Sequence, residues 1–115
     1  MDVTLYHNPA CSHSRGALEL LKTRGAEFTV IEYLKRPPGR ETLEQIIAML
    51  DGPVEELVRK DKRFSELGLK PAAYADKEAV IGILLQHPEL MQRPIVIRRG
   101  HAVIARPAEK LQALF

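Results

Sequence analysis

Residues 4–22, "TLYHNPACSHSRGALELLK", join a β-rich apolar segment to a helix and contain the single cysteine of this 115-residue chain. The segment at 3–7 has the β-branched and aromatic content of a strand, and the Asn-Pro pair after it signals a turn. Apolar residues at helical spacing follow, and Gly25 is a stop signal. The stretch therefore predicts a strand, a turn and a helix beginning near Ser12, with Cys11 at the junction.

The rest of the sequence continues the alternation of strands and helices. Residues 27–34, "EFTVIEYL", predict a second strand, and 93–107 predict two short strands joined by an Arg-Gly turn. Between them, helices are predicted in the middle third of the chain, one of them capped by Asp76. We predict these helices at 40–50, 54–60 and 77–87, and a last helix at 108–115.

This order of elements predicts an α/β protein with a thioredoxin-like, four-stranded mixed sheet. The helical insertion, at about 40–88, separates the second and third strands. A right-handed strand–helix–strand unit comes first, and a hairpin supplies the antiparallel strands. The length and the absence of a linker predict one domain, residues 1–115.

Composition narrows the class of protein. A formal charge of +2 and six aromatic residues without tryptophan disfavour nucleic-acid binding. We find no apolar run long enough for a membrane span and no signal-peptide pattern, and a single cysteine is typical of a reducing compartment. We therefore expect a cytoplasmic, monomeric protein that binds a small ligand, with no membrane or nucleic-acid partner.

Cys11 lies where a thiol can be reactive. Free cysteine is usually a small, inert, buried residue, which is the alternative interpretation. At the start of a helix, however, unpaired N–H groups stabilise a thiolate and also attract anions. Arg15 lies one helical turn further on, and Arg93 and Arg106 flank the terminal strands. We expect these arginines to offset the negative charge of a thiolate and an oxyanion, whereas Arg24, Arg40 and Arg99 are expected to be surface charges.

Ser14 stands where a Cys-x-x-Cys motif has its second cysteine, and its hydroxyl cannot form a disulfide. An oxidised or adducted Cys11 must therefore be released by an external thiol, such as glutathione or another protein.

Several motifs together resemble the glutaredoxin-coupled arsenate reductase (ArsC) family. They are "YHNPACSHSR", "RPPGRETL", "LVRK", "LLQHPELMQRPIVI" and "ARPAEKL". The resemblance runs in register from Val3 to Leu114, and its most specific parts are "YHNPxC…SR" and "RPIV". The sequence "CSHSR" in place of "CGTSR", and the end at Phe115, are similar to a shorter branch of this family.

The resemblance implies a role for each matching residue. Cys11 is implied to be the nucleophile that attacks arsenate. The residues that match the arginines holding arsenate are Arg59, Arg93 and Arg106. Positions thought to lower the thiol pKa or to shape the active-site loop are matched by His7, Asn8, Ser14 and Arg15. Pro94 matches the cis proline common in this fold.

The implied activity is reduction of arsenate to arsenite, with no bound cofactor or metal. Cys11 forms a thiol–arsenate adduct, glutathione attacks it as co-substrate, and glutaredoxin reduces the remaining mixed disulfide. The family's relatives leave two alternatives: a non-catalytic Spx-like regulatory or binding protein, and a thiol oxidoreductase of the same fold acting on another substrate.

Two other classes of site are less well supported. A cysteine phosphatase loop places its arginine six positions after the cysteine, whereas Arg15 is four positions after Cys11. A metal site built from His7, Cys11 and His13 lacks a fourth ligand.

Overall fold

The computed structural model describes residues 2–115. The chain forms two compact units: the N-terminal segment up to Arg36 together with Arg93–Phe115, and the intervening Pro37–Gln92. The second unit contains the helical insertion predicted at about 40–88.

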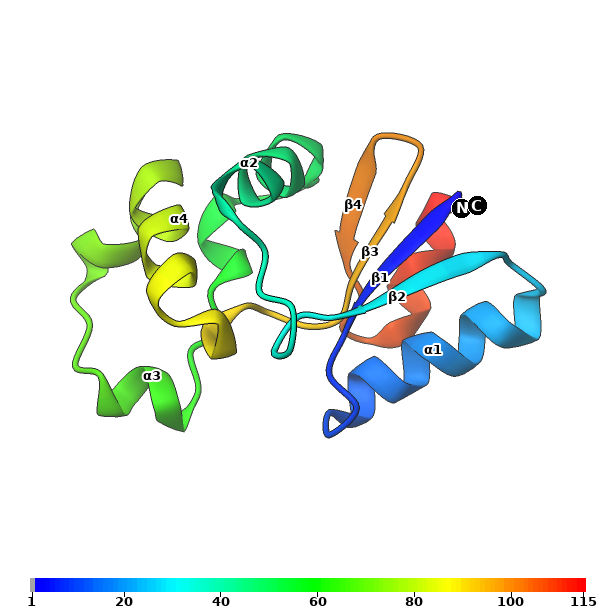
Figure 1. Cartoon of the computed structure of the whole chain (residues 1–115), viewed down its shortest axis with the longest axis horizontal. Helices are drawn as coiled ribbons and strands as arrows, with labels where there is room; N and C mark the ends of the chain where they lie inside the picture. Colours follow the sequence, from blue (N-terminus) through cyan, green and yellow to red (C-terminus); the bar gives the residue numbers. More distant parts are fainter. Residues whose placement is uncertain (1) are drawn as a thin grey trace. The chain divides into compact units, whose positions relative to one another are not determined.

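The first unit contains the four-stranded mixed sheet that the sequence predicts (Figure 1). Its strands, in the spatial order β2-β1-β3-β4, are β1 (Val3–His7), β2 (Phe28–Glu32), β3 (Ile95–Arg98) and β4 (His101–Ile104). β1 and β2 are parallel, β3 is antiparallel to β1, and β4 is antiparallel to β3. The carboxyl ends of β1, β2 and β4 therefore lie at the same edge of the sheet as the start of β3.

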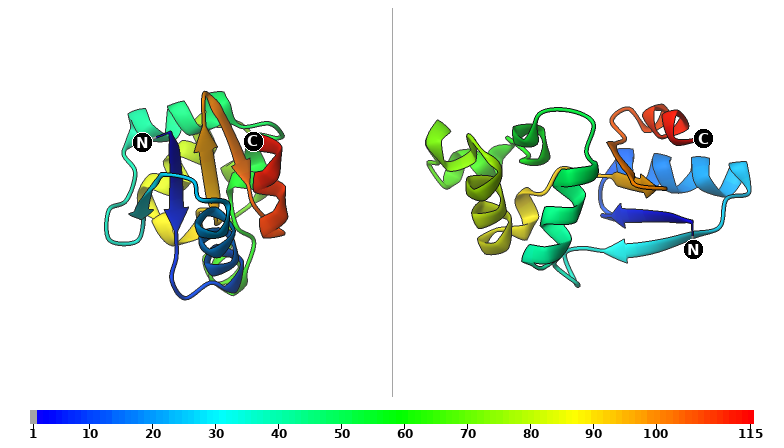
Figure 2. Two further views of the ribbon diagram at one scale, coloured as in Figure 1. Left: turned by 90° about the vertical axis from the view of Figure 1, so that its right-hand side faces the viewer. Right: turned by 90° about the horizontal axis from the view of Figure 1, so that it is seen from above.

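One face of this sheet is covered by α1 (Ser12–Arg24) and by η4 (Ala108–Leu114), as the right-hand view in Figure 2 shows. A shared core joins the sheet to these two helices. Its buried members are Val3, Leu5, Ala17, Leu21, Val96, Ala105, Ala108 and Leu111. α1 and η4 lie close together at Gly16, where a Cβ would lie 3.4 Å from that of Ala108. α1 ends at Gly25, whose φ of 73° is the left-handed conformation expected of a helix stop.

Two predicted elements of this unit differ in detail. β2 stops at Glu32, because the backbone N–H groups of Lys35 and Arg36 donate to the carbonyl oxygen of Glu32 and close a turn. The predicted C-terminal helix is a 3-10 helix, whose start is fixed by a hydrogen bond from Lys110 N–H to the Pro107 carbonyl. The Arg93–Pro94 peptide bond is cis, as the resemblance predicts, and so is Arg106–Pro107.

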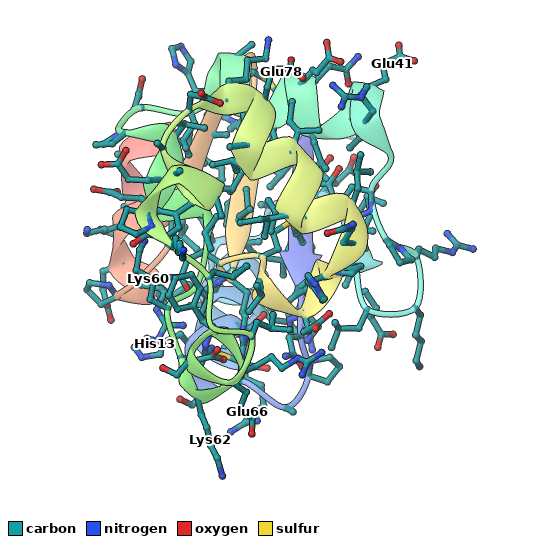
Figure 3. The ribbon with its side chains drawn as sticks, turned by 90° about the vertical axis from the view of Figure 1, so that its left-hand side faces the viewer. His13, Glu41, Lys60, Lys62, Glu66 and Glu78 are labelled. Atoms are coloured by element: carbon teal, nitrogen blue, oxygen red, sulfur yellow. The ribbon has the colours of Figure 1, made fainter. Side chains whose placement is uncertain are left out.

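The second unit is made of short helices. They are α2 (Arg40–Met49), η1 (Val54–Leu57), α3 (Lys62–Glu66), η2 (Pro71–Tyr74), α4 (Lys77–Gln86) and η3 (Pro88–Leu90). The Asp76 side chain accepts a hydrogen bond from Ala79 N–H, which confirms the predicted cap. In α3, Lys62 and Glu66 are exposed and project away from the ribbon (Figure 3). No helix within residues 2–115 has the length and apolar character of a membrane span.

The helix predicted at 54–60 is wrong in its second half. After one 3-10 turn the chain becomes extended, and Val58 pairs with Met91 in an isolated antiparallel bridge. Arg59 N–H donates to the Leu90 carbonyl and Gln92 N–H donates to that of Leu57. These long-range backbone bonds replace the helical ones, so Arg59 lies outside the helix.

Candidate active site

Cys11, Arg93 and Arg106 meet at one edge of the sheet. Tyr6, near the end of β1, pairs with Ile95 at the start of β3, and Ile95 pairs with Ile104 at the end of β4. The residues that precede β3 and follow β1 and β4 are therefore neighbours. Arg106 Nη1 lies 3.7 Å from Cys11 Sγ and donates to the Arg93 carbonyl oxygen at 2.9 Å.

Cys11 is the N-cap residue of α1. Its backbone is extended (φ −97°, ψ 124°), and its carbonyl accepts the first helical hydrogen bond, from Arg15 N–H at 3.0 Å. The residue is buried, with 8% of its surface exposed, so the thiol is largely desolvated. This position turns the free N–H groups of the first helical turn toward the sulfur.

The surroundings lower the pKa of Cys11 to about 7. Burial is the largest single influence and raises the pKa, because it penalises the charged thiolate. Three donors together outweigh it: the backbone N–H of Ser14, the guanidinium of Arg93, and the backbone N–H of His13. A large fraction of the thiol is consequently ionised at neutral pH, as a nucleophile requires.

Ser14 connects the loop before Cys11 to the helix after it. Its fully buried side chain accepts a hydrogen bond from Asn8 N–H at 3.0 Å, and its Oγ lies 2.7 Å from Nδ1 of His7. Burial lowers the pKa of His7, which favours the neutral ring. The Ser14 hydroxyl can then donate its proton to Nδ1. His7 therefore acts on the site by holding Ser14 in place.

Asn8 and Arg15 complete the loop. The side-chain oxygen of Asn8 accepts a hydrogen bond from Ala10 N–H at 3.0 Å. The backbone carbonyl oxygen of Asn8 accepts another from Cys11 N–H, also at 3.0 Å. Arg15 Nη1 donates to the Pro9 carbonyl at 2.8 Å. The four residues predicted to support the active-site loop thus all contact it, and they fix the turn that presents the sulfur.

Arg59 lies in the second unit, where Asp61 holds it in an ion pair of 2.9 Å from Nε. Its Nη1 is buried and has no hydrogen-bond partner. The three arginines expected at the surface do lie there. Arg24 lies over the ring of Phe115, Arg40 pairs with Glu44 and Glu78, and Arg99 is exposed at the hairpin.

His7, Cys11 and His13 do not form a metal centre in the part of the chain that the structure describes. Within residues 2–115 there is no cluster of three or more histidine, cysteine, aspartate or glutamate side chains suited to a metal ion. His13 is exposed, and His7 Nδ1 is engaged by Ser14.

Sequence reasoning missed Tyr33. It follows β2 directly, is fully buried, and its hydroxyl has no hydrogen-bond partner of ordinary length. Its pKa is raised, chiefly by burial, although the side chains of Arg93 and Asn8 oppose that rise. A tyrosine ending a predicted strand, at the same sheet edge as the cysteine, was the available signal.

The fold and this site define a class: a thioredoxin-fold protein with one activated cysteine at a helix N-terminus and two arginines beside it. Within that class the chain belongs to the ArsC family, whose sequence profile matches residues 6–114. Proteins named arsenate reductase are similar to it. That of Acidiphilium multivorum is 42% identical over 94% of this chain and 77% of its own, and that of Neisseria meningitidis is 37% identical over 98% and 97%.

Solved structures agree with these sequence relatives. The arsenate reductase from Vibrio cholerae has a TM-score of 0.89 and 34% identity, and the match covers 100% of this chain and 98% of that protein. The resemblance to the ArsC family that the motifs indicate is thereby confirmed, as is the thioredoxin-like fold.

Proposed function

We propose that this protein is an arsenate reductase that uses glutathione as its reductant. The observation that carries the proposal is the activated sulfur of Cys11, with Arg106 Nη1 at 3.7 Å and the Arg93 guanidinium stabilising the thiolate. A thiolate and an arsenate anion repel each other, and these cations make their close approach possible. The family and its arsenate reductase relatives support the choice of substrate.

The reaction we propose has three steps. The Cys11 thiolate attacks arsenic(V) and displaces hydroxide, which leaves as water after protonation and gives a thiol–arsenate adduct. A glutathione thiolate then attacks the sulfur of Cys11. The sulfur–arsenic bond breaks with its electron pair on arsenic, so arsenite is released and Cys11 is left in a mixed disulfide with glutathione. Glutaredoxin reduces that disulfide.

An external reductant is required because the chain has one cysteine. Ser14 occupies the position from which a second thiol would resolve the adduct, and its hydroxyl cannot do so. We place this chemistry in the cytoplasm, where glutathione keeps thiols reduced. Arg59 is proposed as a third arginine that contacts the oxyanion, and guanidinium suits a tetrahedral oxyanion through paired donors.

The test is arsenate-dependent NADPH oxidation in the presence of glutathione, glutaredoxin and glutathione reductase. We expect turnover by the purified protein and none by Cys11→Ser. Omitting glutathione should stop turnover, and mass spectrometry of a reaction without glutaredoxin should show glutathione attached to Cys11. Absence of turnover with a reactive, intact thiol would exclude arsenate reduction and favour another substrate or a binding role.

A further inference from the structure

The buried hydroxyl of Tyr33 is a polar group that the reaction above does not use. The side chain is fully buried, yet no group makes a hydrogen bond of ordinary length with its oxygen, and the side chains of Asn8 and Arg93 come only near enough to influence its pKa. Buried hydroxyl groups in folded proteins are nearly always paired, because an unpaired one has lost its water without compensation. An exception next to an active site therefore calls for a physical explanation, and one explanation is a partner that the ligand supplies.

Tyr33 lies at the sheet edge that carries the cysteine. β1 and β2 run parallel, and the last pair in their register is His7 with Glu32. The next residues are Asn8, in the loop that leads to Cys11, and Tyr33, each one position past the end of its strand. The side chain of Asn8 is close enough to lower the pKa of Tyr33. Tyr33 is therefore a neighbour of the active-site loop.

Its charged surroundings are those of the site itself. Arg93 and Asn8 lie near enough to lower the pKa of Tyr33, and the thiolate of Cys11 opposes them, but burial dominates and raises it. The phenol is thus protonated at neutral pH. A protonated phenol has one proton to donate, and the oxygen atoms of an oxyanion are strong acceptors.

We propose that the Tyr33 hydroxyl donates a hydrogen bond to the oxyanion that Arg93 and Arg106 hold beside Cys11. Tyr33 is then a substrate-binding residue, and ligand binding satisfies a donor that is unpaired in the free protein. This inference rests on the proposed function, since it assigns a fourth group to the same anion site. The hydroxyl is a neutral donor, so it favours anion binding without adding charge. The pKa of Cys11 should therefore not depend on it.

The test compares Tyr33→Phe with Tyr6→Phe, which removes a hydroxyl from a buried tyrosine of β1. The first measurement is the arsenate concentration that half-protects Cys11 from alkylation, with sulfate as a second probe. In Tyr33→Phe, loss of a hydrogen bond to a charged group should raise this half-protecting concentration about 10- to 100-fold. In Tyr6→Phe the concentration should stay within about twofold of the wild-type value. The KM for arsenate should rise in parallel.

The pKa of Cys11, taken from the pH dependence of alkylation, separates direct contact from an indirect effect. If Tyr33 contacts the anion, Tyr33→Phe keeps a Cys11 pKa of about 7. If Tyr33 instead holds Arg93 in place, the pKa rises and the proposal is wrong. Unchanged protection by arsenate in an active Tyr33→Phe enzyme would also overturn it while leaving the proposed function intact. A wild-type protein that shows neither protection nor turnover would overturn both.

A measurement on the unmodified chain covers the case in which Tyr33→Phe fails to fold. Tyrosine labelled with carbon-13 at Cζ gives one signal for each of Tyr6, Tyr33 and Tyr74, and Tyr6→Phe and Tyr74→Phe identify the Tyr33 signal by elimination. Arsenate should shift the Tyr33 signal and leave that of Tyr74 in place. No shift at saturating arsenate would contradict the proposal.

Discussion

Arg106 Nη1 lies 3.7 Å from the sulfur of Cys11, although 95 positions separate the two residues in the chain. The contact depends on the order of the sheet, which sets the end of β4 beside β3 and β3 beside β1. The same Nη1 donates to the Arg93 carbonyl at 2.9 Å, so one nitrogen joins both terminal-strand segments to the thiol. The pair is thus held by the fold itself, and the charge near Cys11 can be altered one arginine at a time.

Arg93→Ala should raise the pKa of Cys11. The Arg93 guanidinium lowers this pKa both as a hydrogen-bond donor and as a charge, and without it burial is less well opposed. We expect a shift from about 7 toward the ordinary value of about 8.5. The measurement is the rate of iodoacetamide alkylation against pH. Arg99→Ala, at the exposed hairpin turn, is the control, and superimposable profiles for the two variants would contradict this assignment.

The lowered pKa of Cys11 predicts how stability depends on pH. Above a pH of about 7 the folded protein has lost the thiol proton, whereas the unfolded chain keeps it until about 8.5. The unfolded state therefore binds more protons in this window, and the free energy of unfolding rises with pH. The gain, up to about 2 kcal/mol, should vanish as pH falls below about 7.

The contribution of thiol ionisation to stability can be measured by urea unfolding of the wild type and of Cys11→Ser. The two proteins are compared at matched pH values from about 6 to about 9, a range that brackets the folded and unfolded pKa values. The difference in unfolding free energy between the two proteins should grow with pH. A constant difference would mean that the folded and unfolded thiols titrate alike.

Ser14→Ala should destabilise the fold. The change leaves His7 Nδ1 and the Asn8 N–H without the partner that they share, and both residues are buried. A cost of about 1–3 kcal/mol is expected for leaving buried polar groups unsatisfied. Urea denaturation measures it, with Ser12→Ala as control because Ser12 is exposed on the same helical turn. Equal stability of the two variants would show that water replaces the hydroxyl.

The strand–turn–helix that presents Cys11 could be predicted from the sequence, because each part has a local signal. The strand has its β-branched residues, and α1 ends at the Gly25 predicted to stop it. The prediction that Cys11 is reactive also rested on a local feature, its position at the start of a helix. These are short-range features, and their physical causes lie within a few residues.

The features that sequence reasoning missed depend on contacts far apart in the chain. Residues after Leu57 have helical character, yet Val58 pairs with Met91. The unpaired hydroxyl of Tyr33 depends on how β2 ends beside the loop of Cys11. A single sequence has no pattern that indicates the bridge between Val58 and Met91. It also has none that indicates the missing hydrogen-bond partner of Tyr33.

Asp61→Asn should separate two functions of one carboxylate. Asp61 Oδ1 accepts from Phe64 N–H at 3.1 Å and caps α3, while Oδ2 pairs with Arg59 Nε at 2.9 Å. Asparagine can cap the helix equally well, so stability should change by less than about 0.5 kcal/mol. The ion pair is lost, and Arg59, which we propose as an oxyanion ligand, becomes more mobile and should bind the anion less well. We expect the KM for arsenate to rise about two- to tenfold, as for the loss of a partly exposed ion pair.

Asp61→Ala is the comparison, because it removes the cap as well and should cost about 1 kcal/mol of stability. A KM that stays at the wild-type value in Asp61→Asn would mean that Arg59 does not need the carboxylate for arsenate binding.

His13→Ala should leave Cys11 activated, although the imidazole is only two residues from the thiol. The group of His13 that lowers the pKa of Cys11 is its backbone N–H, which every residue except proline supplies. The side chain is exposed, so its removal opens no cavity. The alkylation profile of His13→Ala should therefore keep its midpoint near pH 7. The matched variant His13→Pro removes the N–H and should raise that midpoint, and a rise in His13→Ala would instead assign the effect to the imidazole.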